Sequence, residues 1–120
     1  MRFDAQLYTF KAFETDAAGG HGPCYRCIFP APPPEGQIPT CAEAGVLGAL
    51  CGMAGSLQAT EVLKELIGIG ESLSGALMIY DGLATTFRKI SVKPDPGCRL
   101  CGDSPVITDL TIHQAESQSP

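Results

Sequence analysis

"GPCYRCIFP" at residues 22–30 and "PDPGCRLCGD" at residues 94–103 carry two cysteine pairs of identical Cys-x-x-Cys spacing. Each pair can place two thiolates on one side of a tetrahedral metal ion, and the neighbouring Gly and Pro residues allow the backbone to curl around that ion. One such pair is weak evidence for a metal site, whereas two in one chain are strong evidence. We therefore predict a structural zinc site with four ligands: Cys24, Cys27, Cys98 and Cys101.

Three other assignments of these cysteines remain open: an iron site, a redox-active pair and disulfides. A thioredoxin-like pair opens a long helix that follows a strand, and neither pair has this context. Zinc held by four thiolates leaves no coordination position for water, so a structural role is expected, joining residues 24–27 to residues 98–101. His21 is expected to be a loop histidine rather than a ligand, and His113 carries no functional signal.

The composition of the 120 residues limits the class of protein. This length corresponds to a single domain, and an apolar content of 44% indicates a globular chain. The formal net charge of −5 disfavours nucleic acid as a partner, and with it a zinc-ribbon nucleic-acid binder. Neither a membrane span nor a signal peptide is evident, so we expect a reducing, cytoplasmic location. There, six cysteines are more often metal ligands or reactive thiols than disulfides.

Strand and loop signals lie on both sides of a central helical region. Residues 2–13 are rich in Phe and Tyr and predict a strand. Five prolines within residues 30–39 predict an extended crossing loop, because proline fits neither a helix interior nor an inner strand. Residues 74–93 predict two strands around a turn at Asp81-Gly82.

A long helix is predicted between Thr40 and Gly68. Thr40 with Glu43 three residues later fits a capping box, and Gly68 is a suitable C-terminal stop. The first half is apolar almost all round, which predicts burial on most sides. The second half is amphipathic, with apolar side chains opposing charged ones: Val62, Leu63, Leu66 and Ile67 against Glu61, Lys64 and Glu65.

Glycines recur along this helix at spacings of three and four. On a helix they form a smooth stripe, which predicts close approach of another backbone; a kink near Gly52 that makes two shorter helices is the alternative. The glycines of the stripe are Gly45, Gly48, Gly52 and Gly55.

The fold class that follows is α+β, with antiparallel strands packed on one long or kinked apolar helix and zinc at the edge. Residues 1–102 form the zinc-bearing portion. Residues 103–120 form a polar tail in which 106–112 can add an edge strand and the last residues are expected to be disordered.

Two cysteines lie outside the pairs. With Thr40 as N-cap, Cys41 would take the first helical position, where the helix dipole and free N–H groups stabilise a thiolate and Glu43 partly counters them. Cys41 is therefore a candidate catalytic thiol, with an inert cysteine in the capping region as the alternative. Cys51, in the apolar part of the helix, is expected to be a buried small hydrophobe.

Four stretches, taken together and in this order, resemble the ThiF/MoeB/HesA family of E1-like activating enzymes, over about residues 3–102. This resemblance implies the C-terminal part of the E1-like fold, zinc bound by the two cysteine pairs, and a homodimer interface near the glycine-rich helix. The stretches are "GPCYRCIFP" (22–30), "PTCAEAGVLGALCGMAGSLQATEVLKELIGIG" (39–70), "LMIYDGL" (77–83) and "DPGCRLCG" (95–102).

Members of that family use ATP and Mg²⁺ to adenylate the C-terminal glycine of a ubiquitin-like sulfur-carrier protein, for thiamin or molybdopterin pathways. In some members the cysteine that Cys41 matches is linked to the carrier or takes part in sulfur transfer; in others it is not required for adenylation. The family's nucleotide-binding half has no counterpart here, and no phosphate-binding glycine loop is present. The 120 residues alone are thus expected to be inactive. A stand-alone structural zinc module for protein interaction is the alternative function.

Overall fold

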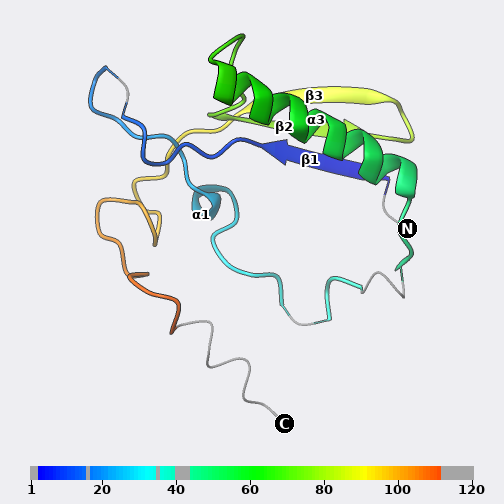
Figure 1. Cartoon of the computed structure of the whole chain (residues 1–120). Coiled ribbons are helices and arrows are strands. Elements are labelled where there is room, and N and C mark those ends of the chain that lie inside the picture. The colour runs from blue at the N-terminus through cyan, green and yellow to red at the C-terminus, as the bar shows by residue number, and fades with distance from the viewer. Residues whose placement is uncertain (1–2, 16, 35, 40–43, 112–120) are drawn as a thin grey trace. The chain divides into compact units, whose positions relative to one another are not determined.

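A three-stranded antiparallel sheet and one long helix supply most of the regular structure, which confirms the predicted α+β arrangement of strands and helix (Figure 1). The computed structural model describes residues 3–15, 17–34, 36–39 and 44–111. The chain divides into a sheet unit, Met1–Phe10 with Pro32–Val92, and a cysteine unit, Lys11–Ala31 with Lys93–Pro120. In chain order the elements are β1 (Asp4–Tyr8), α1 (Tyr25–Ile28), α3 (Gly48–Ile67), β2 (Ala76–Asp81) and β3 (Thr86–Ser91).

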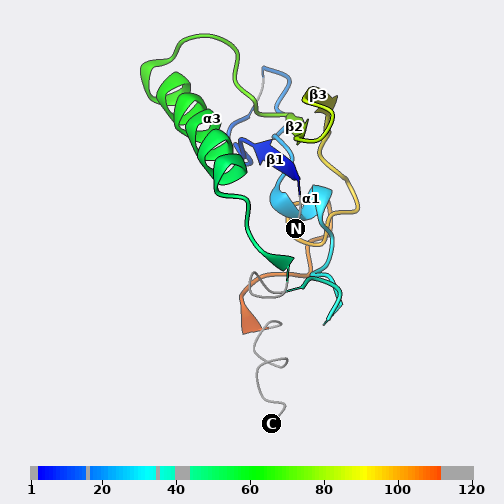
Figure 2. The same cartoon turned by 90° about the vertical axis from the view of Figure 1, so that its right-hand side faces the viewer.

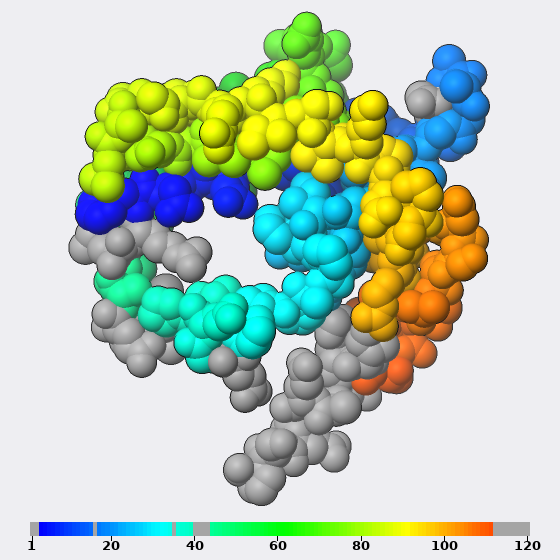
Figure 3. Space-filling view, turned by 180° about the vertical axis from the view of Figure 1, so that it is seen from behind, coloured from blue at the N-terminus to red at the C-terminus, as the bar shows by residue number. Residues whose placement is uncertain are grey.

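The sheet has the strand order β1-β2-β3, and Figure 3 shows β1 running alongside the β2–β3 hairpin. The predicted turn at Asp81-Gly82 is confirmed: the Asp81 carboxylate accepts hydrogen bonds from the N–H groups of Leu83 and Ala84, at 2.9 and 3.1 Å. Gly82 donates its N–H to the carbonyl oxygen of Phe3 at 2.7 Å. A Cβ at this position would lie 2.6 Å from the same oxygen, so the hairpin end requires glycine.

The helix α3 lies along one face of the sheet and contacts β1 (Figure 2). The buried apolar cluster of the sheet unit consists of Leu7, Leu73 and Ala76. Ala54 and Leu57 of α3 pack against this cluster. The core is small, so each of its members contributes a large share of the hydrophobic stabilisation.

The predicted helical region is interrupted near its start, because Ala44 is helical but the three residues after it are not. Residues 45–47 are not helical, and Gly45 has a left-handed backbone with φ of 72°, so α3 begins at Gly48. The proposed capping residues Thr40 and Glu43 lie outside the described residues. The helix runs without interruption through Gly52, where a kink was the alternative, and ends as predicted at Gly68, with φ of 74°.

The predicted burial of α3 is wrong. None of its residues is buried, and Cys51 is exposed rather than buried. A helix over a three-stranded sheet has one neighbour and can cover only the side that faces it. The half-buried positions recur at helical spacing on that side: Leu50, Met53, Ala54, Leu57, Glu61, Lys64 and Glu65.

The second half of α3 is amphipathic, but its charged side faces the sheet. Its charged residues are half-buried and its apolar residues face solvent. Each charged group has a partner within the sheet unit: Lys64 pairs with Glu61 at 2.7 Å, and the Ser72 hydroxyl donates to Glu65. The second carboxylate oxygen of Glu61 is buried without a hydrogen-bond partner. The exposed apolar side chains are 56–78% exposed: Val62, Leu63, Leu66 and Ile67.

The predicted close approach to the glycine stripe is not found within the described chain. A Cβ built at Gly48, Gly52 or Gly55 would meet nothing within 4 Å. The side of α3 that carries the glycine stripe and the exposed apolar side chains therefore has no packing neighbour among the described residues.

Three smaller predictions also need correction. The first strand covers Asp4–Tyr8 instead of 2–13, and the short helix α1 was not anticipated. Within the expected edge strand at 106–112, the described residues 106–111 form no strand, because their backbone folds into the cysteine unit: the N–H groups of Val106 and Ile107 both donate to the Arg99 carbonyl oxygen at 2.9 Å. In the described part of the chain, no helix has the length and apolar character needed to cross a membrane.

Replacing Leu7 with alanine tests the importance of the small core. Leu7 is 3% exposed, so Leu7→Ala should lower the free energy of unfolding by about 2–5 kcal/mol through lost burial and a residual cavity. Leu83→Ala removes the same atoms from a side chain 76% exposed and should cost less than about 0.5 kcal/mol. Urea unfolding of both variants measures this, and equal losses would contradict the assigned core.

Candidate metal centre

The first cysteine pair lies at the start of the short helix α1. Cys24 immediately precedes the helix, with extended backbone, and Cys27 lies within it. The Cys27 N–H donates to the Cys24 carbonyl oxygen at 3.1 Å, which closes one tight turn. In this turn the two Sγ atoms lie 3.8 Å apart.

The second pair lies in a turn that its own backbone stabilises. The Cys98 N–H donates to the Asp95 carbonyl oxygen at 2.9 Å, and the Gly102 N–H donates to the Cys98 carbonyl oxygen at 3.0 Å. The Asp95 carboxylate also accepts a hydrogen bond from the Gly97 N–H at 2.8 Å. Sequence analysis identified the Pro-Gly before this pair as turn material but missed the part played by Asp95 and Gly102.

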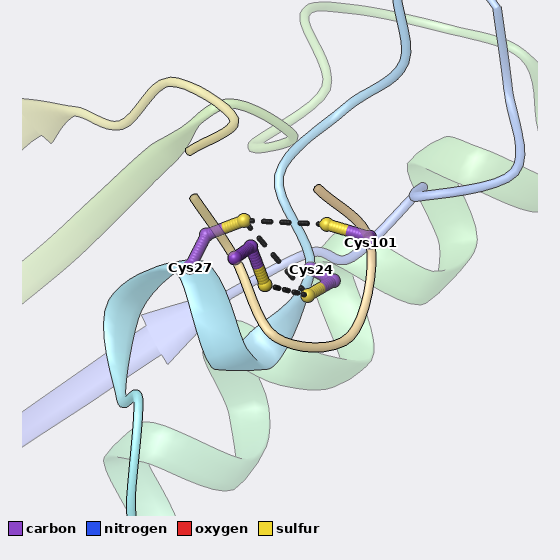
Figure 4. Close-up of side chains that lie close together, drawn as sticks. Cys24, Cys27 and Cys101 are labelled. Atoms are coloured by element: carbon purple, nitrogen blue, oxygen red, sulfur yellow. Dashed lines mark hydrogen bonds between the residues drawn. The ribbon is translucent and has the colours of Figure 1, made fainter. Parts of the chain in front are cut away.

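The four predicted ligand atoms come together in one cluster. The Sγ atoms of Cys24, Cys27, Cys98 and Cys101 all lie within 4.8 Å of one another. Two contacts join the pairs, Cys27 to Cys101 at 3.4 Å and Cys24 to Cys98 at 3.6 Å, and Figure 4 shows the labelled thiols pointing toward one another. Four sulfurs at about 2.3 Å from a tetrahedral zinc ion are separated by about 3.8 Å, so this donor set fits zinc.

Backbone N–H groups are directed at two of the sulfurs. The Asp95 N–H donates to the Cys27 Sγ at 3.4 Å, and the Leu100 N–H donates to the Cys98 Sγ at 3.5 Å. Four thiolates around a divalent cation carry a net negative charge, and such hydrogen bonds partly compensate it and orient the ligands.

Three thiols of the cluster have shifted pKa values. Burial raises the pKa of Cys24 and of Cys101, and the neighbouring thiols raise the pKa of Cys101 further. Burial acts in the same direction on Cys98, but hydrogen bonds from the backbone N–H groups of Cys101 and Leu100 and from the Cys24 thiol lower its pKa to about 7. A divalent cation must therefore displace protons from Cys24 and Cys101, and its affinity should fall as the pH falls.

Gly102 allows the second turn to close. A Cβ at this position would lie 2.4 Å from the Pro96 carbonyl oxygen and 2.6 Å from the Cys98 carbonyl oxygen. Both neighbours are backbone atoms of the same turn, so any side chain would force the turn open and move Cys98 or Cys101.

Substitution of Gly102 tests this geometry without changing a ligand. Gly102→Ala should weaken metal binding about 10–100-fold, as other changes to groups that orient metal ligands do. In the matched control Gly97→Ala, the nearest atom to the new Cβ would be the Asp95 Oδ1 at 3.4 Å, so a smaller change is expected. Competition with a chromogenic chelator gives both affinities, and equal affinity of Gly102→Ala and the unmodified chain would contradict the argument.

The other histidines and cysteines discussed from the sequence are not part of the described thiol cluster. His21 is not part of the cluster, and its Nδ1 lies 2.9 Å from the Gly22 carbonyl oxygen, to which it can donate a hydrogen bond. Cys41 and His113 lie outside the described residues. Cys51 is a free, exposed thiol on α3, and none of the five described cysteines forms a disulfide.

The chain belongs to the ThiF family, whose sequence profile matches residues 1–100. This assignment agrees with the resemblance seen in the sequence and implies an E1-like fold.

Individual relatives are similar along nearly the whole chain. It is 48% identical over 114 residues to the sulfur carrier protein adenylyltransferase of Thermus thermophilus, which covers 95% of this chain and 41% of that protein. It is 44% identical over 116 residues to the adenylyltransferase and sulfurtransferase MOCS3 of Bos taurus, and 47% identical over 115 residues to MOCS3 of Drosophila sechellia. The chain spans 24% of each of these two longer relatives.

Proposed function

We propose that these 120 residues are the C-terminal, zinc-bearing portion of an E1-like adenylyltransferase that activates the C-terminus of a ubiquitin-like sulfur-carrier protein. The observation that carries this proposal is the four-thiol cluster in a chain of the ThiF family. The names of the relatives, sulfur carrier protein adenylyltransferase and adenylyltransferase and sulfurtransferase, support the type of reaction. ATP and Mg²⁺ would serve the adenylation step, in a thiamin or molybdopterin type of pathway.

The proposed role of zinc is structural. Cys24, Cys27, Cys98 and Cys101 would fill its four coordination positions and leave none for substrate or water. Zinc bound in this way contributes about 10–16 kcal/mol in small zinc-binding peptides, which is comparable to the whole stability of a domain. The ion would join the turn at residues 24–27 to the turn at residues 98–101. Thiolate ligands must stay reduced, which is consistent with a cytoplasmic location.

Cys41 is the proposed thiol for covalent contact with the carrier or for sulfur transfer. It follows a proline-rich segment, residues 30–39, and the described part of that segment contains neither helix nor strand. In the alternative function, a structural module without catalysis, Cys41 would be an ordinary thiol.

The proposed homodimer would use the outward face of α3. That face combines the small residues Gly48, Gly52 and Gly55, which let a neighbouring backbone approach, with exposed apolar side chains further along the helix. Exposed apolar surface of this kind favours association.

Zinc analysis of the purified chain tests the proposed metal site. We expect about one zinc ion per chain, with four thiols that become accessible to a thiol reagent only after chelation. Cys24→Ser should lose the ion, whereas Cys51→Ser, which changes an exposed cysteine outside the cluster, should retain it. Absence of metal together with paired disulfides in freshly purified protein would refute the site.

Alkylation of Cys41 at neutral pH separates the two functions. A thiol activated at a helix start should react much faster with iodoacetamide than Cys51 does in the same molecule. The variant Cys41→Ser shows which part of the measured alkylation comes from Cys41. Equal rates for the two thiols would favour the structural module.

The 120 residues alone should catalyse no ATP–pyrophosphate exchange with a sulfur-carrier protein, because the sequence has no phosphate-binding glycine loop. Exchange above background would overturn this expectation.

A further inference from the structure

The four cysteine residues of the cluster differ in how far they are exposed to solvent. Cys24 and Cys98 are buried, 6% and 4% exposed, whereas Cys27 and Cys101 are only half-buried. The two more exposed cysteines come from different Cys-x-x-Cys pairs, and their Sγ atoms lie 3.4 Å apart, closer than the 3.8 Å between Cys24 and Cys27. The cluster therefore has an outer pair, Cys27 and Cys101, and an inner pair, Cys24 and Cys98, with the inner sulfurs 3.6 Å apart.

We propose that the outer pair is an oxidative modification site, at which a peroxide forms a Cys27–Cys101 disulfide with release of the metal while Cys24 and Cys98 remain thiols. This inference rests on the proposed zinc site. Oxidation of cysteine follows thiolate character and exposure. All four ligands of a bound zinc ion are thiolates, so exposure decides between them and selects the outer pair.

The chemistry balances with hydrogen peroxide as the oxidant. One thiolate of the outer pair attacks a peroxide oxygen and becomes a sulfenic acid, and the first hydroxide leaves. The second thiolate attacks that sulfur, the S–S bond forms, and the second hydroxide leaves. The two sulfurs have then lost two electrons to the peroxide, and both hydroxides take up protons from water. A zinc ion held by the cluster would keep only Cys24 and Cys98 as ligands and would dissociate.

The pairing decides the structural consequence. A Cys27–Cys101 disulfide joins the same two turns that zinc joins, so oxidation would exchange one cross-link for another and keep the cysteine unit closed. Disulfides within each pair, Cys24–Cys27 or Cys98–Cys101, would instead leave the two turns without a connection.

The sequence makes the pairing measurable. Arg26 and Arg99 lie inside the two Cys-x-x-Cys pairs, so trypsin places the four cluster cysteines on four different peptides. The zinc-loaded chain would receive one equivalent of hydrogen peroxide, with a chromogenic chelator recording zinc release. N-ethylmaleimide would then block the remaining thiols before digestion without reductant and mass spectrometry. The double variant Cys41→Ser, Cys51→Ser removes the two other cysteines and serves as the matched background.

The expected product is a cross-linked peptide pair that contains Cys27 and Cys101, with maleimide on Cys24 and Cys98 and about one zinc ion released per disulfide. A first disulfide within either pair, one between Cys24 and Cys98, or retention of zinc after disulfide formation would overturn the inference. If the purified chain holds no zinc, the zinc proposal fails before peroxide is added. The disulfide formed in that protein still decides whether the outer pair is the site of modification.

Discussion

The contact between four sulfur atoms, drawn from turns about 70 residues apart in the sequence, is the interaction on which the cysteine unit depends. The two turns are closed by local backbone hydrogen bonds, and the thiols of Cys24, Cys27, Cys98 and Cys101 form the cluster that joins them. The buried cysteines of this cluster, Cys24 and Cys98, lie at the centre of the cysteine unit, as apolar side chains do in the core of a larger domain. Without a cation, the packed thiols would contribute little to stability. With one, they would become charged ligands that hold both turns.

In the sheet unit the constraint is geometric, because a helix over three strands can bury only the side that faces the sheet. Its small apolar cluster around Leu7 is covered by the middle of α3, while further along the helix charged side chains face the sheet and apolar ones face outward. Lys64 with Glu61 and Ser72 with Glu65 lower the cost of this orientation, because each half-buried charged group has at least one partner. An outward apolar face of this kind is suited to contact with another surface, and the proposed dimer would use it.

Membership of the ThiF family connects these features to a function without assigning the whole reaction to this chain. The chain spans 41% of the Thermus relative and 24% of the animal relatives, so their complete activity is a proposal here. What these residues themselves offer is a cluster of four thiols that fits a metal ion, a candidate thiol at Cys41 and exposed helical surface. Oxidation at the outer sulfurs would connect the stability of the cysteine unit to the redox state of its surroundings.

The sequence by itself determined the features that depend on neighbouring residues. Identical Cys-x-x-Cys spacing with turn-forming neighbours singled out the four cysteines whose thiols come together, Asp81-Gly82 located the hairpin, and Gly68 marked the end of α3. Each of these follows from the conformational limits of a few adjacent residues. The tertiary structure alone decided which side of α3 is covered, that Cys51 is exposed, and which cluster sulfurs lie outermost. Those features depend on which distant surfaces are available to pack, and an apolar pattern records a preference for burial without recording whether a partner is present.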